Sequence, residues 1–293
     1  MDTMLSYTRN VVLPKIASVW GIISYPILFF YVQLKVMVIW VIVTFFVLAF
    51  MSIYTGRDFL IYEFNNALME TDMVKLSAIT GIVVLLIVWL IKHKSWEESG
   101  FWKVSDISAY SLVLCALAGV ITNYFWTGIF HLSGLPELFP GYAELTDSLF
   151  RGHIAYQVLG IAIIAPIVEE VVYRGIVLKR LLNMPMNFHA ANIIQALIFG
   201  IMHLNVLQST HAFFGGITLG LAYAKFKTIW APIIIHITFN LWSVIIINIE
   251  KHYNIESSDT FIAITTIMSA LAIITFLYNM LKTSDIDDEN LPQ

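Results

Sequence analysis

The sequence has little charge, a single cysteine and no excess of basic residues. Charged side chains occupy 12% of its 293 positions, against about 25% in a typical soluble domain. Cys115 has no second cysteine to pair with, which excludes a disulfide-stabilised secreted module. Sixteen Lys and Arg stand against 20 Asp and Glu, so the chain lacks the basic surface of a nucleic-acid-binding protein.

Long apolar runs dominate the chain instead. Hydrophobic residues make up 59% of it, and its mean hydropathy is +0.80. A run of about 20 apolar residues predicts a membrane span, and such a span must be helical to satisfy its own backbone. The candidate spans are 11–32, 36–54, 74–91, 107–130, 154–178, 190–207, 211–226, 229–248 and 259–281.

The first candidate span contains Pro14, Lys15 and Pro26, so it either crosses the membrane or lies in its interface. It lacks a small-residue cleavage site and is not expected to be a signal peptide. We therefore expect an all-α, polytopic membrane protein, a bundle of eight or nine transmembrane helices. Linker-like stretches separate some of these spans, at 55–73, 92–106 and 131–150, and a polar tail follows residue 282.

Basic residues near the span ends predict the orientation, because cytoplasmic loops are enriched in Lys and Arg. If the spans alternate, most of these residues fall on one side. The residues on that side are Lys92, Lys94, Lys103, Lys179, Arg180, Lys225, Lys227 and Lys282. We expect the C-terminus and the loop at Lys179 to be cytoplasmic.

The fifth candidate span is interrupted by charge. Glu169, Glu170 and Arg174 lie within an apolar run, and ionised groups at membrane depth usually pair or line a polar cavity. Glu170 and Arg174 are four residues apart and can form an ion pair on one helix face. Glu169 points about 100° away from Glu170. The spacing predicts a structural pair, with Glu169 presented to a cavity.

Two later spans add imidazole and amide groups. His203 lies in the sixth span, and His236 shares a face of the eighth with Asn240, one turn away. A carboxylate, two imidazoles and an amide can activate water and stabilise an oxyanion. Two histidines and a carboxylate are also the ligand set of a zinc site with an open position. The residues alone leave both chemistries open.

Other polar or small residues are given structural interpretations. Cys115 lies inside the fourth span, without a neighbouring charge to activate it, and is expected to be a small core residue. Gly215, Gly216 and Gly220 predict close helix packing in the seventh span. No role is assigned to the histidines at span ends or in loops, which are His153, His189, His211, His93, His131 and His252.

Three blocks of sequence, taken together, resemble a known family. Glu169-Glu170-xxx-Arg174, Phe199-xxx-His203 and His236-xxx-Asn240 are similar to the motifs of the CPBP family, which comprises CAAX proteases and bacteriocin-processing enzymes and is also called the Abi family of intramembrane proteases. The resemblance covers about 146–248. It divides the chain into N-terminal transmembrane helices of unassigned role (1–145), a protease core (146–248), and a last span with a polar cytoplasmic tail (249–293).

The resemblance implies a role for each motif residue. Glu169 and His203 would hold and deprotonate the attacking water, and His236 and Asn240 would polarise the scissile carbonyl and stabilise the oxyanion. The supporting residues would be Glu170, Arg174 and Phe199. The resemblance does not decide between a metal-free glutamate mechanism, slightly favoured because His-Glu-x-x-His is absent, and zinc held by Glu169, His203 and His236.

The expected function is an intramembrane endopeptidase in the lipid bilayer of a bacterial cell membrane. Its substrate would be a peptide or membrane protein, with CAAX-type processing, bacteriocin or pheromone leader processing and self-immunity as the classes implied by the family. One alternative is a non-proteolytic scaffold that regulates a membrane partner such as a sensor kinase. Another is a transporter or proton relay, which buried Glu, His and Arg also mark, although no inverted repeat or paired broken helices support it.

Overall fold

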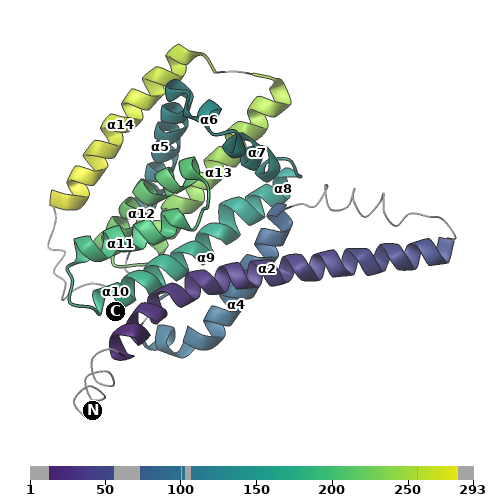
Figure 1. Cartoon of the computed structure of the whole chain (residues 1–293). Coiled ribbons are helices and arrows are strands. Elements are labelled where there is room, and N and C mark those ends of the chain that lie inside the picture. The colour runs from purple at the N-terminus through teal and green to yellow at the C-terminus, as the bar shows by residue number, and fades with distance from the viewer. Residues whose placement is uncertain (1–12, 56–72, 100, 103–106, 256, 283–293) are drawn as a thin grey trace, which may run out of the picture.

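The computed structural model describes residues 13–55, 73–99, 101–102, 107–255 and 257–282, and within these all regular secondary structure is helical (Figure 1). Five helices there are long and apolar enough to cross a membrane: α2 (Leu13–Thr55), α4 (Met73–Ser99), α5 (Ala109–Ser133), α13 (Trp230–Tyr253) and α14 (Asp259–Lys282). The protein is therefore an all-α, multi-pass integral membrane protein, as its composition predicts.

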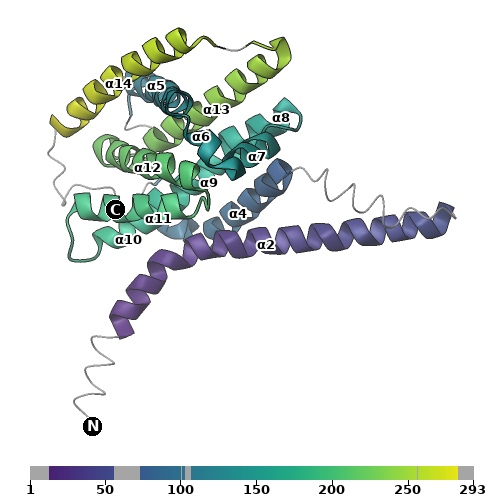
Figure 2. The same ribbon diagram turned by 45° about the horizontal axis from the view of Figure 1, so that its top comes forward.

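The first two candidate spans, 11–32 and 36–54, are not separate helices over the described residues. They form the single helix α2, of 43 residues, about 65 Å long at 1.5 Å per residue. No Gly or Pro lies between residues 32 and 36 to start a turn, and Pro26 is accommodated inside the helix. Its first half lies against the bundle, whereas its second half extends away from it (Figure 2).

The helices α5, α13 and α14 pack side by side at one face of the molecule (Figure 1). Close approach depends on small residues, because a Cβ at Gly119 would collide with Thr238, and one at Gly128 would collide with Thr266. Cys115 lies fully buried in this group, as expected. Asn123 also links α5 to α13, because its Nδ2 donates to Phe239 O at 3.0 Å and to Ser243 Oγ at 2.5 Å.

The stretch 131–150, expected to be a linker, is largely helical. Gly134 caps the end of α5, with a φ of 62° that suits glycine. The short helices α6 (Leu135–Leu138) and α7 (Pro140–Leu149) follow. Each has a proline at its start, where the missing N–H costs nothing. Composition alone indicated a loop because prolines and acidic residues are frequent here, although both are also typical of a first helical turn.

The fifth candidate span is one continuous helical run whose hydrogen-bond register changes along it. It consists of α8 (Ile154–Gln157), the π-helical segment η2 (Val158–Ile164), α9 (Ala165–Val172), the π-helical segment η3 (Tyr173–Leu178) and α10 (Lys179–Leu182). At the end of η2 the Ala165 N–H bonds to Gly160 O, five residues back. In the same register, the N–H of residue 166 would bond to Ile161 O. Residue 166 is a proline without an N–H, so the Ile161 carbonyl can accept from another helix.

The sixth and seventh candidate spans correspond to α11 (Phe188–Ile201) and α12 (Val206–Phe226). A turn separates them, with Asn205 capping α12 through the N–H groups of Leu207 and Gln208. The two helices pack closely, because Gly216 faces Ala196 and Gly220 faces Asn192. The close packing predicted for the glycine face is confirmed at these two positions, whereas Gly215 faces open space.

Candidate active site

The motif residues of three helices meet in the middle of the bundle. Arg174 Nη1 donates to Glu170 Oε1 at 2.8 Å, and both side chains are fully buried. The predicted ion pair is therefore confirmed. The second Arg174 nitrogen, Nη2, donates to Gly216 O at 3.0 Å, so the guanidinium also ties α12 to this cluster. Gln195 Nε2 donates to the same carbonyl at 2.9 Å.

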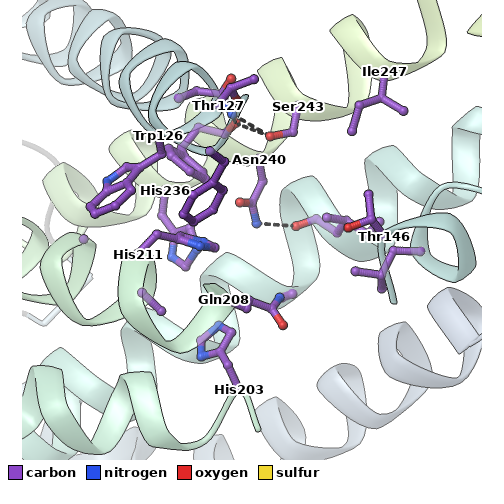
Figure 3. Close-up of a pocket in the computed structure, with 18 of the residues that line it drawn as sticks. Trp126, Thr127, Thr146, His203, Gln208, His211, His236, Asn240, Ser243 and Ile247 are labelled. Carbon is purple, nitrogen blue, oxygen red and sulfur yellow. Dashed lines mark hydrogen bonds between the residues drawn. The ribbon is translucent and has the colours of Figure 1, made fainter. Parts of the chain in front are cut away.

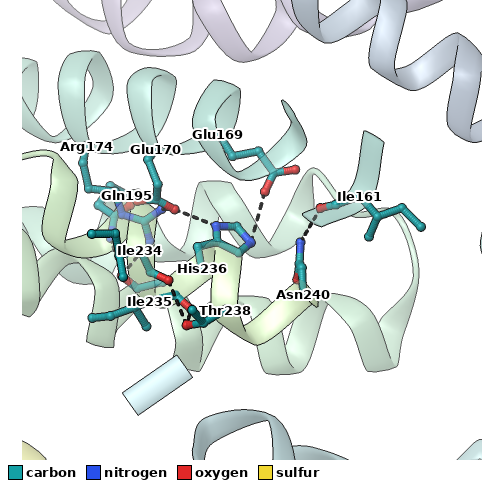
Figure 4. Close-up of polar contacts among 11 residues, drawn as sticks. Ile161, Glu169, Glu170, Arg174, Gln195, Ile234, Ile235, His236, Thr238 and Asn240 are labelled. Carbon is teal, nitrogen blue, oxygen red and sulfur yellow. Dashed lines mark hydrogen bonds and ion pairs between the residues drawn. The ribbon is translucent and has the colours of Figure 1, made fainter. Parts of the chain in front are cut away.

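The ion pair extends to His236 of α13. His236 Nδ1 lies 2.8 Å from Glu170 Oε1, the oxygen that also accepts from Arg174. Because a carboxylate only accepts, the proton of this contact belongs to Nδ1. The other ring nitrogen, Nε2, lies 3.6 Å from Glu169 Oε2, too far for a direct hydrogen bond. Figure 4 shows this series of contacts, from Arg174 through Glu170 and His236 to Glu169.

Burial decreases along this series. Arg174 and Glu170 are inaccessible, the His236 side chain is 11% exposed and that of Glu169 is 23% exposed. The ionic anchor is therefore enclosed in protein, and the carboxylate at the other end faces open space. This is the division between the two glutamates that their 100° separation on the helix predicts.

Asn240 lies one turn beyond His236 and bonds to the irregular helix opposite. Its Nδ2 donates to Ile161 O at 2.9 Å, the carbonyl released by the π-helical register and Pro166. An amide nitrogen carries two protons, so one N–H remains for a ligand. Irregular π segments are frequent at functional sites, and here η2 fixes the direction of the Asn240 amide (Figure 4).

Phe199 separates the two motif histidines. Its ring centroid lies 4.8 Å from that of His203 and 6.0 Å from that of His236, edge to face in both cases. His203 Nδ1 donates to Phe199 O at 2.9 Å, which leaves Nε2 of His203 as the available nitrogen. Arg174 lies against the same ring, 5.0 Å from its centroid. Phe199 thus packs against both imidazoles and the buried cation.

A cavity of about 610 Å³ opens onto these residues (Figure 3). Five of the seven motif residues line it, whereas Glu170 and Arg174 lie behind it. The five are Glu169, Phe199, His203, His236 and Asn240. Its other walls come from α5, through residues such as Asn123 and Trp126, and from α7, through Tyr142 and Thr146. Residues before 146 therefore contribute to the cavity around the motifs.

His211 of α12 lines the cavity, although no role was predicted for it from the sequence. Its ring stacks on Phe239 with centroids 5.9 Å apart and lies 6.2 Å from Trp126. It shares one face of α12 with Gln208 and Thr218, and all three line the cavity. The helical spacing of these three polar residues can be recognised in the sequence. No role was predicted for His211 because it lies near the end of a predicted span.

Glu169, His203 and His236 are the candidate zinc ligands. Among the described residues, no three His, Cys, Asp or Glu side chains are placed to hold a metal ion together. His203 directs Nδ1 to a backbone carbonyl and His236 directs Nδ1 to Glu170. These contacts leave Nε2 of both rings available on the cavity side.

The part of the chain that contains the motif residues resembles known proteins. Residues 151–242 match the family model "Type II CAAX prenyl endopeptidase Rce1-like". Over this segment, the chain is similar to CAAX proteases. A relative from Bacillus subtilis (strain 168), named "Putative membrane peptidase YdiL", is 28% identical over 174 residues, which cover 58% of this chain and 70% of the relative. No solved structure matched the chain significantly. The matched family segment contains all seven motif residues and leaves α2, α4 and α5 outside it.

Proposed function

We propose that this protein is an intramembrane endopeptidase of the CPBP/CAAX family, which hydrolyses a peptide bond with water activated by Glu169 and His203. The observation that carries the proposal is the contact series from buried Arg174 to Glu169, ending at a cavity of about 610 Å³. A cavity of this size can enclose several residues of an extended peptide, because ligand sites span about 300–1,000 Å³. The three available polar groups, from Glu169, His203 and Asn240, all face it.

In the first step, Glu169 and the Nε2 atom of His203 orient a water molecule, and Glu169 takes its proton. The water oxygen bonds to the scissile carbonyl carbon, and the carbonyl oxygen becomes an oxyanion. The carbon–nitrogen bond then breaks, and Glu169 returns the proton to the leaving amine. Atoms and charge balance without an added co-reactant, and general acid–base catalysis of this kind contributes about 10²–10⁴-fold.

His236 and Asn240 stabilise the oxyanion. Asn240 uses the Nδ2 proton that is not bonded to Ile161 O. His236 donates from Nε2 in its imidazolium form, in which both ring nitrogens carry a proton. When the oxyanion forms, Glu169 carries the proton from water and Glu170 balances Arg174, so the oxyanion itself balances the charge of the imidazolium. Fixed donors in an enclosed site are worth more than donors in water, because they need no reorganisation.

Glu170 and Arg174 act as positioning residues. The pair holds Nδ1 of His236, so that Nε2 faces Glu169 and the cavity. Phe199 limits the movement of both imidazoles by packing between them. The proposed substrate is a peptide or membrane protein reached within the bilayer, in CAAX-type, leader or self-immunity processing, with the C-terminus of the enzyme on the cytoplasmic side.

The test is a cleavage assay in reconstituted vesicles that compares the wild type with Glu169→Ala and His203→Ala on leader-bearing and prenylated peptides. The expected result is cleavage by the wild type and a loss of at least 100-fold in both variants. An unchanged wild-type rate after chelation supports the metal-free route, and a loss restored by Zn²⁺ contradicts it. If nothing is cleaved, while both variants restore the phenotype of a deletion strain, the scaffold alternative replaces the protease.

A further inference from the structure

Glu169, Phe199 and His203 separate two spaces of very different size. On one side lies the cavity of about 610 Å³. On the other lies a small pocket of about 70 Å³, lined by the same three residues and by Pro26, Phe29 and Phe30 of α2, among others. The proposed water-activating pair thus faces the same pocket as α2, which lies outside the matched family segment of residues 151–242.

The face of α2 that reaches this pocket follows from helical spacing. Pro26, Phe29 and Phe30 are three and four residues apart and share one face. That face is held against the bundle, because Ile22 and Val32 are buried in its core. Arg180 of α10 adds a contact over the Tyr25 ring, 4.9 Å from its centroid. The two phenylalanines are therefore fixed as a wall beside Glu169.

Within the proposed peptidase function, we propose that this small pocket is the subsite for the side chain next to the scissile bond, and that Phe29 and Phe30 limit its size. A peptide bond placed at Glu169 and His203 has the large cavity on one side, so a side chain flanking that bond can enter the pocket on the other side. The remaining wall is mainly apolar and consists of Val168, Val172, Tyr173 and Met202.

The volume determines which side chains fit. A water molecule occupies about 30 Å³ of liquid, and a cavity of about 150 Å³ accepts benzene. A pocket of about 70 Å³ therefore admits the few heavy atoms of Ala, Cys or Val and excludes an aromatic ring. Its apolar wall favours these residues over charged ones of similar length. The substrate class is thus a peptide with a small apolar residue adjacent to the cleaved bond.

The test uses full-length protein in vesicles and a synthetic peptide library with randomised positions, with cleavage sites identified by mass spectrometry. The variants are Phe30→Ala and the milder Phe30→Leu, which serves if the alanine variant does not fold. The matched control is Phe46→Ala, which removes the same ring from an exposed position of α2 outside the pocket (66% exposed).

Wild type and Phe46→Ala are expected to select a small apolar residue at one position beside the cleaved bond. Both Phe30 variants should raise the ratio of kcat/KM for Leu or Phe over Ala at that position by about 10-fold or more, the usual scale for added pocket contacts. Active Phe30 variants with an unchanged ratio would overturn the size limit alone. Library cleavage that is absent in the wild type, or undiminished by Glu169→Ala, would overturn the proposed peptidase function and this subsite with it.

Discussion

His236 Nδ1 and Glu170 Oε1 are 2.8 Å apart, and that oxygen also accepts from Arg174 Nη1 at 2.8 Å. A single carboxylate oxygen therefore joins a fully buried cation to the ring that borders the cavity. The geometry gives Glu170 two tasks, to balance Arg174 and to orient His236. The two tasks have different experimental consequences and can be separated by mutation.

Replacing Glu170 with Leu is expected to lower both the stability and the activity. It leaves the fully buried Arg174 without its charge partner, and breaking a buried pair from one side costs about 3–5 kcal/mol. It also removes the acceptor of His236 Nδ1. The unfolding temperature in detergent and the rate of peptide cleavage should both be lower than in the wild type.

The double variant Glu170→Leu with Arg174→Met separates the two effects. Removing both charges replaces the pair with apolar groups, which is often close to neutral for stability. The unfolding temperature should therefore return towards the wild-type value, while cleavage stays low because His236 remains unanchored. Recovery of cleavage together with stability would show that Glu170 has no orienting role.

Gly216→Ala is expected to destabilise the contact between α11 and α12. Its Cβ would lie 2.9 Å from Ala196 Cβ and 3.0 Å from Ala196 Cα, and overpacking of this kind costs about 1–3 kcal/mol. The same shift would displace Gly216 O, which accepts from Arg174. Gly215→Ala is the matched stability control, since nothing lies within 4 Å of its added methyl group. An equal loss of stability in both variants would contradict the packing interpretation.

Asp147 is expected to make the attachment of α7 depend on pH. Hydrogen bonding and charge attraction from Arg151, with a smaller effect of Lys251, lower the pKa of Asp147 below its ordinary 3.8. A lowered folded-state pKa means that the stabilisation is complete above the ordinary value and is lost as pH falls through the folded pKa. Asp147→Asn should therefore be less stable than the wild type at neutral pH, and the gap should close below pH 3.8. A gap in unfolding temperature that is independent of pH would contradict this.

The charged part of the site was predictable from the sequence because helical spacing is a local property. The four-residue interval places Glu170 and Arg174 on one helix face, where they can pair. Glu169 lies about 100° away on the helix, so its side chain points away from this pair. The connection from Glu170 to His236 spans 66 positions. It depends on how α13 packs against α9, which spacing within one helix does not encode.

The irregular parts were less accessible to sequence reasoning. The spans 11–32 and 36–54 were expected to be separate helices. A turn between them would need a residue such as Gly or Pro, and residues 33–35 contain neither. The π register of η2 depends on Pro166 together with a partner for Ile161 O. That partner, Asn240, lies 79 residues away, so the local sequence alone could not indicate it.

Asn240→Leu is expected to abolish most of the activity with a modest loss of stability. The variant removes the proposed oxyanion donor, and loss of one such donor costs about 10²–10³ in kcat. It also removes the hydrogen bond to Ile161 O, and an interhelical bond of this type in a membrane protein is worth about 0.6–1.7 kcal/mol.

Asn248 offers a matched control on the same helix. Its Nδ2 donates to Gln157 Oε1 at 2.7 Å, so it also links α13 to the irregular helical run, two turns beyond Asn240 and away from the motif residues. Asn248→Leu should lower the unfolding temperature by a similar amount and leave kcat largely intact. If the two variants lose kcat equally, Asn240 contributes only packing between helices, and the oxyanion must be stabilised by His236 without it.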